Sequence, residues 1–302
     1  MCNGENGYTS AMRETFKGGY HPLYPGHPNF NQELEQMTVN IRPDIVFIQT
    51  QNQGALYPHV AQSVGKLAFT LQFSGDIRWT TEQFYKEIGR GIQLTTFSNG
   101  RDVDNCIKDG INADFLQIGI DPQIFKPIGI QKDPAHQVVM LFNNYAGHFE
   151  LSNYREQIVH LLLREFAGKT SVWGNGWNGR EAGNLNHSQA AENELLNKAK
   201  IAINVSHFNA LRYSSDRLLR SLASGVMVIS HRYPGIEIDF QDGVHLVCYD
   251  SDKDLVNKVR YYLEHDEERE RIAAEGCKLA HQRHTFKNMA EDIAALYHKW
   301  KK

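Results

Sequence analysis

The chain has 302 residues, of which 41% are hydrophobic and 22% charged, and its formal net charge at pH 7 is −3. This is the composition of a soluble globular protein with room for about two domains. It excludes the global basic field of many nucleic-acid-binding proteins, although it remains compatible with a local basic groove.

No stretch approaches the length of apolar sequence that crosses a membrane, and the N-terminus MCNGENGYTSAMRETF lacks a basic flank followed by an apolar core. Cys2, Cys106, Cys248 and Cys277 form no CxxC pair, which favours free thiols in a reducing compartment. We therefore expect a cytoplasmic protein with no transmembrane segment.

The N-terminal half predicts strands separated by helical stretches, with apolar runs at 44–50, 66–73, 92–98 and 114–120. A sheet of this kind normally opens with an apolar strand, whereas this chain begins in what resembles the loop after it. Either the start is truncated, or the first strand is missing or contributed otherwise. The polar stretch 121–135, with three prolines and Gly129, is expected to be a hinge.

The C-terminal half alternates regularly between apolar strands and amphipathic helices. Strands are predicted at 136–144, 170–174, 201–206, 226–231 and 245–250, and helices at 153–168, 188–200, 214–225, 252–264, 266–283 and 285–299. This alternation predicts βαβ units and parallel sheets covered on both faces. The expected fold is α/β with two Rossmann-like domains facing a central cleft, the first spanning 1–130 and the second 131–284.

Ligands of open α/β sheets bind at the carboxyl ends of the strands, and three loops at that edge of the second domain have suitable residues. Ser214, Ser215 and Asp216 begin a helix whose N-terminus favours phosphate, and Arg212 and Arg217 flank it. An ordinary capped helix with solvated arginines is the alternative.

The other two loops are NNYAGHF at 143–149 and WGNGW at 173–177. Their glycines allow close backbone approach, and either tryptophan is a candidate to flank a nucleobase. Together the three loops favour a bound nucleotide diphosphate. The candidate donor-binding residues in these two loops are Asn144, Gly147, Trp173, Gly174, Asn175 and Trp177.

Two segments carry a family resemblance. LQIGIDPQIFKP at 116–127 resembles the segment that closes the N-terminal domain in many two-domain GT-B glycosyltransferases, and residues 216–276 resemble their donor-binding half. The likeness is closest to the spore-maturation-protein-like glycosyltransferases of bacteria and phages. It implies a nucleotide-sugar donor, UDP-linked, in the second domain and an acceptor in the first, without a metal or resident cofactor. It also implies that the final helix, 285–302, braces the first domain.

The resemblance assigns further donor-site residues. His231 is implied as a catalytic donor to a phosphate or sugar hydroxyl, and the other implied donor-binding residues are Tyr213, Tyr233, Gly235 and Glu237. Many retaining relatives carry two glutamates at the positions of Arg212 and Arg220, so this departure leaves the stereochemistry, the donor and the activity open. Arg220 on a solvated helix face is an equal alternative to a donor contact.

On the acceptor side, Asp76 follows a predicted strand and is the candidate general base, with Gly75 and Arg78 beside it. An Asp–Arg pair or a helix cap before Thr80 is the alternative. His21, His27 and His59 are weaker candidates for the base. Asp102-Val103-Asp104 matches a metal-binding DxD pattern, but its place at a helix start favours a structural role.

The predicted function is transfer of a sugar from a nucleotide-diphosphate donor to a hydroxyl acceptor, which is a glycan, a small molecule or modified DNA. Two alternatives stay open. One is glycosylation of hydroxymethylated bases in phage DNA, and the other is a non-catalytic nucleotide- or glycan-binding protein of the same fold.

Overall fold

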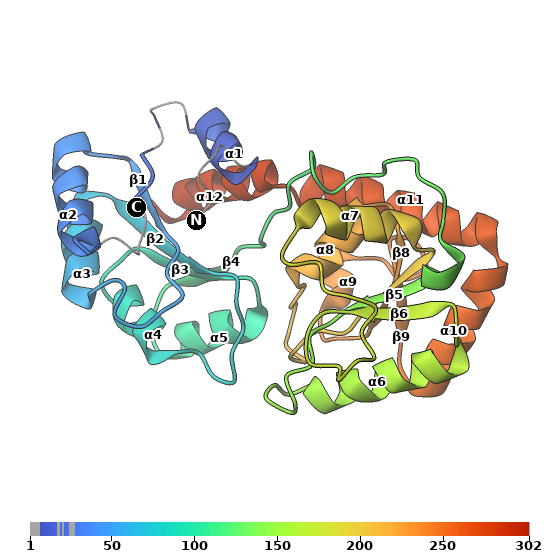
Figure 1. Cartoon of the computed structure of the whole chain (residues 1–302). Coiled ribbons are helices and arrows are strands. Elements are labelled where there is room, and N and C mark those ends of the chain that lie inside the picture. Colours follow the sequence, from blue (N-terminus) through green and yellow to red (C-terminus); the bar gives the residue numbers. More distant parts are fainter. Residues whose placement is uncertain (1–6, 17–18, 20, 24–27, 302) are drawn as a thin grey trace. The chain divides into compact units, whose positions relative to one another are not determined.

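The computed structural model describes residues 7–16, 19, 21–23 and 28–301, and the chain divides into two compact units. The first unit contains Tyr8–Ile118 and the chain from Lys287 onward, and the second contains Gly119–Phe286. Each unit is an α/β structure built on its own parallel sheet (Figure 1). The predicted fold class is confirmed.

The first unit has a four-stranded sheet in the order β1-β2-β3-β4. Its central strand β2 is buried at every position, as expected for a parallel strand covered on both faces. Among the described residues before β1, the regular elements are two helices, α1 and α2. The elements are α1 (Gly7–Thr15), α2 (Phe30–Ile41), β1 (Ile45–Ile48), α3 (Pro58–Leu67), β2 (Phe69–Ser74), α4 (Gln83–Gly89), β3 (Leu94–Phe97), α5 (Gly100–Lys108), β4 (Ala113–Phe115) and α12 (Phe286–Trp300).

Helix α12 packs on the sheet of the first unit, on the side opposite α4 and α5 (Figure 1). The ring of Tyr297 meets Phe69 of β2 edge to face, with 5.3 Å between centroids. Near the end of the helix, the Trp300 indole donates to the Asp114 carboxylate of β4 at 3.0 Å. The chain therefore returns to the first unit after completing the second.

The second unit has a five-stranded sheet in the order β6-β5-β7-β8-β9. Helices α7, α8 and α11 cover one face, and α6 and α10 cover the other (Figure 1). The elements are η1 (Pro134–His136), β5 (Val138–Leu141), α6 (Ser152–Glu165), β6 (Thr170–Trp173), α7 (Gln189–Lys198), β7 (Ile201–Asn204), α8 (Asp216–Ala223), β8 (Met227–His231), α9 (Ile236–Asp239), β9 (Val247–Tyr249), α10 (Asp252–Glu264) and α11 (Asp266–Arg283).

This strand order determines where a ligand can bind. β5, β7 and β8 are adjacent and parallel, so the loops that follow them emerge at the same edge of the sheet. The interior beneath is dry, since Met140, Ile203 and Ile229 belong to one buried cluster. A rigid core therefore supports the loops that follow residues 141, 204 and 231.

Helix α8 begins and ends where its sequence predicts. The Ser215 hydroxyl accepts a hydrogen bond from the Leu218 amide at the N-terminus. Gly225, with a φ of 74°, turns the chain out of the helix and into β8. Leu218, Leu219 and Leu222 are fully buried and fix the helix on the sheet.

The predicted strand at 114–120 is shorter in the structure, because its second half leaves the sheet. The backbone of Ile120 instead pairs with residues 284 and 286, through its amide at 2.8 Å and its carbonyl at 3.0 Å. A Cβ on Gly119 would lie 2.5 Å from the Phe286 amide nitrogen, so glycine permits this close approach.

The expected hinge at 121–135 lies within the second unit, since the chain passes between the units at Gly7–Tyr8, Ile118–Gly119 and Phe286–Lys287. Side chains of α7 hold this segment by hydrogen bonds. Asn193 and Asn197 accept from the amides of Lys126 and Ile128 at 3.1 and 2.8 Å. Across the described part of the chain, no helix is long and apolar enough to span a membrane.

Candidate functional site

Arg155 is a buried cation at the carboxyl edge of the second sheet. It lies in the first turns of α6 and is only 2% exposed, with its guanidinium 4.4 Å from the centroid of the Phe142 ring. Its Nη1 donates to Nδ1 of His207 at 2.5 Å. Its Nε and Nη2 atoms have no hydrogen-bond partner among the described residues. Two buried donors are therefore left for a ligand.

The electrostatics of this position favour an anion. Burial, and then the nearby Arg217 guanidinium, lower the pKa of Arg155 well below its usual value. Burial and the same two arginines lower the pKa of His207 to about 2, so its ring is neutral and accepts from Arg155. A buried charge without a counter-ion costs several kcal/mol, which a bound anion would offset.

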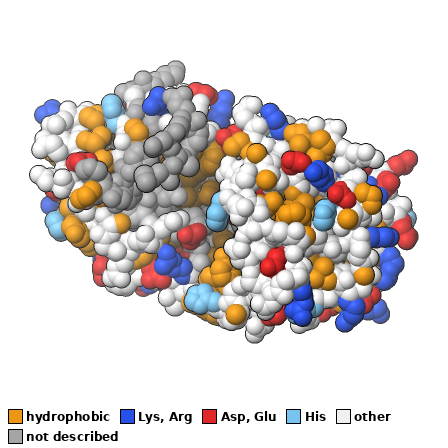
Figure 2. All heavy atoms as spheres, in the orientation of Figure 1, with side chains coloured by type: hydrophobic (Ala, Val, Ile, Leu, Met, Phe, Trp, Pro, Cys, Tyr) orange, Lys and Arg blue, Asp and Glu red, His pale blue; other side chains and the backbone are white. Residues whose placement is uncertain are grey.

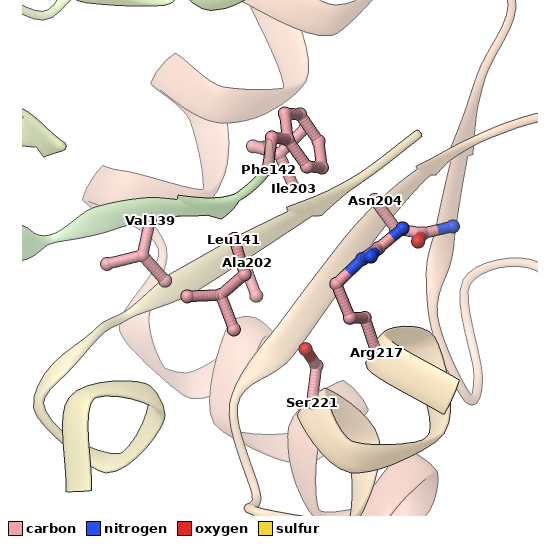
Figure 3. A pocket seen from close by; sticks show the side chains of 8 residues that line it. All are labelled: Val139, Leu141, Phe142, Ala202, Ile203, Asn204, Arg217 and Ser221. Carbon is pink, nitrogen blue, oxygen red and sulfur yellow. The ribbon is translucent and has the colours of Figure 1, made fainter. Parts of the chain in front are cut away.

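Arg217 comes to the same edge from α8. It lines a pocket with Ser221 of the same helix, Asn204 at the end of β7 and Phe142 after β5. Figure 3 shows its guanidinium beside the Asn204 side chain, at the end of the strand. The positive end of the α8 dipole adds to this field. Two arginines and a helix N-terminus thus meet the edge at which parallel sheets bind ligands.

His231 ends β8 and is buried, at 6% exposure. Burial lowers the pKa of its ring to about 4, and the positive charge of Arg155 contributes in the same direction. The imidazole is therefore neutral near pH 7. Its predicted role as a donor to phosphate or sugar stays a prediction.

The loops after β5 and β6 are joined to each other. The Asn144 amide donates to the Asn175 carbonyl at 2.8 Å, and the Asn143 side chain accepts from the Asn175 amide at 2.8 Å. A Cβ on Gly174 would lie 2.3 Å from the Phe142 carbonyl oxygen, so glycine is required for this contact. Gly147 adopts a φ of 80° in the first loop.

The two tryptophans of these loops differ in burial, and the role of Trp173 beside a nucleobase stays a prediction. Trp177 is 2% exposed, and its indole donates to the Phe142 carbonyl at 2.6 Å, so it belongs to the core. Trp173 is half-buried and donates to the Ser171 hydroxyl at 3.0 Å. Tyr145, at 42% exposure, is the exposed aromatic residue of the 143–149 loop.

Arg212 is engaged by a protein carboxylate, and its expected role as a phosphate ligand stays a prediction. Its Nε and Nη2 donate to the two oxygens of Asp239 at 2.9 and 2.8 Å, and its amide donates to the Pro234 carbonyl at 2.7 Å. The neighbouring Ser214 hydroxyl bonds to the Tyr233 hydroxyl at 2.7 Å. These contacts fix the loop that leads into α8.

The remaining predicted donor residues lie around this loop. Tyr213 and Tyr233 are buried, at 8% and 1% exposure. Gly235 has a φ of 76° at the start of α9, where a Cβ would lie 2.9 Å from Leu211. Glu237 is exposed in the first turn of α9. The structure thus brings 211–215 and 232–239 together, with only part of the predicted set accessible.

Arg220 is bonded to two carboxylates of the protein. Its guanidinium pairs with Glu192 of α7 at 3.3 Å and with Asp216 at 3.0 Å, and it stacks over the Phe125 ring at 5.3 Å. Burial raises the pKa of Glu192, and the positive charge of Arg220 opposes that shift. Arg220 therefore compensates a buried carboxylate.

The acceptor-side candidates lie in the first unit, in the loop after β2. Asp76 is exposed. Arg78 donates to the Gln51 carbonyl at 2.8 Å and lies 3.7 Å from Glu82, and the Gly75 carbonyl accepts from Ser98 at 2.9 Å.

Three histidines were weaker candidates for the base, and Asp102 belongs to the DxD pattern. His59 stacks on Tyr57, His21 is exposed, and His27 lies outside the described residues. Asp102 is 3% exposed and accepts from the Thr81 hydroxyl at 2.6 Å and from the Asn99 side chain at 3.0 Å. Asp102 lies in the first turn of α5 and stabilises the N-terminus of that helix.

Arg155 and His207 were not among the predicted site residues. The sequence does indicate a special role for Arg155, because this residue shares the buried face of α6 with Ile158, Val159 and Leu162. A charged residue in the apolar stripe of a helix needs a partner. His207 has no comparable signal, since it follows β7 in an irregular loop.

Comparisons with known proteins give a family match for part of the chain and structural likenesses for its fold. A family model described as "Glycosyl transferase-like" matches residues 155–295, a range that begins at Arg155. Among curated proteins, no significant sequence match is found.

Solved structures resemble the chain over most of its length. Anabaena HepE in complex with UDP has a TM-score of 0.65 at 12% identity, covering 89% of this chain and 82% of that one. A Rickettsia africae glycosyltransferase gives 0.62 at 10% identity, with 94% and 85% covered. Sucrose-phosphate synthase from Thermosynechococcus elongatus gives 0.61 at 8%, with 90% and 77% covered.

These likenesses show the GT-B fold, and the family match adds the enzyme class for residues 155–295. The finer resemblance to the spore-maturation-protein-like enzymes of bacteria and phages stays a prediction. The chain is thus a glycosyltransferase by class, with the GT-B fold and a glycosyl transferase-like domain at residues 155–295.

Proposed function

We propose that the protein transfers a sugar from a nucleoside-diphosphate donor, UDP-linked, to a hydroxyl acceptor. The observation that supports this most is Arg155, a buried guanidinium whose free Nε and Nη2 lie at the sheet edge that Arg217 and α8 also reach. A diphosphate has the charge and the acceptor oxygens that this arrangement lacks. HepE, with the same fold, has been crystallised with UDP and with UDP-glucose.

In the proposed reaction, the acceptor oxygen attacks the anomeric carbon of the donor sugar. The bond between that carbon and the diphosphate oxygen breaks, and the electron pair leaves with the nucleoside diphosphate. Arg155, Arg217 and the α8 N-terminus stabilise the negative charge that develops there. We propose that these cationic groups do so without a metal ion and without a resident cofactor.

The proton of the acceptor hydroxyl needs a base, and Asp76 of the first unit is the proposed one. It is exposed at the carboxyl end of β2, in a loop held by hydrogen bonds. His231 is proposed to donate a hydrogen bond to the donor from its neutral ring.

The experiment is a thermal-shift titration with UDP, GDP, ADP and UDP-glucose, followed by an assay for nucleotide release. Ligand at 100 times its Kd stabilises the folded state by about 2.7 kcal/mol. We expect UDP to raise the Tm of the wild type and not of Arg155→Met. Absence of any shift and any release would contradict the proposal. A shift with no release across many acceptors would favour a non-catalytic nucleotide-binding protein.

A further inference from the structure

His207 holds the guanidinium of Arg155 by one of its three nitrogens. Nη1 of Arg155 lies 2.5 Å from Nδ1 and 3.1 Å from Nε2 of the His207 ring. A ring nitrogen that accepts a hydrogen bond from a guanidinium must carry a lone pair, which the neutral imidazole has and the protonated ring lacks. His207 therefore fixes the direction of the Arg155 side chain without placing a negative charge beside it.

The contact at Nη1 leaves one edge of the Arg155 guanidinium, formed by Nε and Nη2, for another partner. These two atoms are buried and have no hydrogen-bond partner among the described residues. The same edge of Arg212 donates to both oxygens of Asp239, at 2.9 and 2.8 Å. Its two N–H groups match the spacing of two oxygens on one carboxylate or one phosphoryl group. Arg155 is therefore oriented to bind two oxygens of a single anionic group.

The position of His207 relative to α6 is fixed by contacts between two loops. The Leu151 amide, directly before α6, donates to the His207 carbonyl at 3.0 Å. The Asn209 amide donates to the Glu150 carboxylate at 3.3 Å. The His207 ring also packs on Phe149, with 4.6 Å between the ring centroids. The acceptor for the guanidinium is thus held in place before any ligand binds, which lowers the entropic cost of binding.

A neutral partner distinguishes Arg155 from two other arginines of the second unit. Arg212 pairs with Asp239, and Arg220 pairs with Glu192. On the visible face of this unit, Figure 2 likewise shows Lys and Arg side chains interspersed with Asp and Glu side chains. A carboxylate both accepts from an arginine and cancels its charge, whereas a neutral imidazole only accepts. Arg155 therefore keeps a positive charge that a bound anion can compensate.

We propose that His207 is a positioning residue for the donor diphosphate. It directs the Nε and Nη2 edge of Arg155 toward one phosphoryl group, and it leaves the guanidinium charge uncompensated until that group binds. This role rests on the proposed binding of a nucleoside diphosphate and explains how the anion is held. An aspartate in place of His207 would hold the guanidinium in the same way, but it would also neutralise the charge.

The test compares His207→Asn, His207→Asp and His207→Ala in the full-length protein. The side-chain oxygen of asparagine or aspartate takes the place of Nδ1, so the first two variants differ from each other only in charge. His160→Asp is the matched control, because His160 is bonded to Arg180 at 3.1 Å in an exposed pair. Isothermal titration calorimetry measures binding of UDP, pyrophosphate and uridine, and thermal denaturation measures the stability of each ligand-free protein.

We expect His207→Asn to keep the wild-type affinity for UDP and pyrophosphate within about threefold, because it retains a neutral acceptor. His207→Asp is expected to weaken the binding of both anions about tenfold or more, because its carboxylate cancels the charge that they require. It should nevertheless be at least as stable as His207→Asn without ligand. His207→Ala should fall between the two in affinity. Uridine, which has no phosphoryl group, should bind all variants equally, and His160→Asp should bind UDP like the wild type.

Equal UDP affinity in His207→Asn and His207→Asp overturns the positioning role, whatever their stabilities. So does a loss of affinity in His207→Asn as large as that in His207→Ala. Pyrophosphate binding that follows the expected order, with no UDP binding by the wild type, would confirm the role and contradict only the UDP-linked donor. A wild type that binds neither anion would contradict both proposals.

Discussion

The guanidinium of Arg212 is bonded to both carboxylate oxygens of Asp239, at 2.9 and 2.8 Å. This pair joins the loop before α8 to the short helix α9, although 27 residues separate the two in sequence. Arg212 also holds a φ of 54°, a left-handed conformation that is unfavourable for a residue other than glycine. The pair therefore positions Ser214 and Ser215, from which α8 begins.

Because the two side chains form a unit, Arg212→Ala and Asp239→Ala are expected to have nearly equal effects. Each should lower the free energy of unfolding by about 1–3 kcal/mol, and the double variant should lose little more than either one. Chemical denaturation of the four proteins measures this coupling. If Arg212 instead bound phosphate directly, Asp239→Ala would leave UDP affinity intact while Arg212→Ala abolished it.

Arg155→Met is expected to increase the stability of the ligand-free protein and to weaken its binding of UDP. Removing a buried, unpaired charge is expected to raise the free energy of unfolding of the ligand-free protein by about 1–3 kcal/mol. The same change is expected to weaken UDP binding at least a hundredfold, since it removes two free donors. Denaturation without ligand and a UDP titration measure the two quantities.

The control for that variant is Arg164→Met. Arg164 belongs to the same helix, but its side chain is 71% exposed. We expect it to leave both stability and UDP binding within experimental error of the wild type. A loss of stability in ligand-free Arg155→Met would show that the guanidinium is compensated within the protein, and would remove the argument for an anion.

Most of the fold was predictable because strands buried on both faces leave uninterrupted apolar runs. β5, β7 and β8 all fall inside such runs, and the alternation with helices specified the parallel sheets. The end of β4 was not predictable in this way. It depends on the contact of Gly119 with the backbone of residues 285 and 286, far away in sequence.

The site was less predictable, because the roles of its arginines depend on remote carboxylates. Arg212 and Arg220 are both next to the predicted edge, but Asp239 and Glu192 neutralise them from other helices. Arg155 was the reverse case, since it is remote from the phosphate-like motif in sequence and has no carboxylate partner among the described residues. The arginines close to the predicted phosphate-binding loop in sequence therefore did not reveal which guanidinium group is available to a ligand.

The pair of Arg220 and Glu192 gives a third prediction. Arg220→Gln leaves the Glu192 carboxylate buried without its cation, so the free energy of unfolding should fall by about 2–3 kcal/mol. Adding Glu192→Gln should restore most of that loss, because no buried charge then remains. Denaturation of both single variants and the double variant tests this. A double variant as unstable as Arg220→Gln alone would contradict the pairing.

Two buried histidines, His231 and His284, and the half-buried His207 make stability depend on pH. Burial lowers the pKa of His207 to about 2 and those of His231 and His284 to about 4, from 6.5. Below pH 6.5 the unfolded chain therefore binds protons that the folded chain does not. The free energy of unfolding is therefore highest above pH 6.5. Below that pH it falls by up to about 1.4 kcal/mol per pH unit for each histidine.

Urea denaturation between pH 7.5 and 5 measures this slope, and His207→Asn is expected to reduce it by about one proton. UDP at saturation should also reduce the slope, because its negative charge beside Arg155 raises the pKa of His207 in the folded state. A stability that is constant across this range would show that the three rings are already accessible to protons in the folded protein.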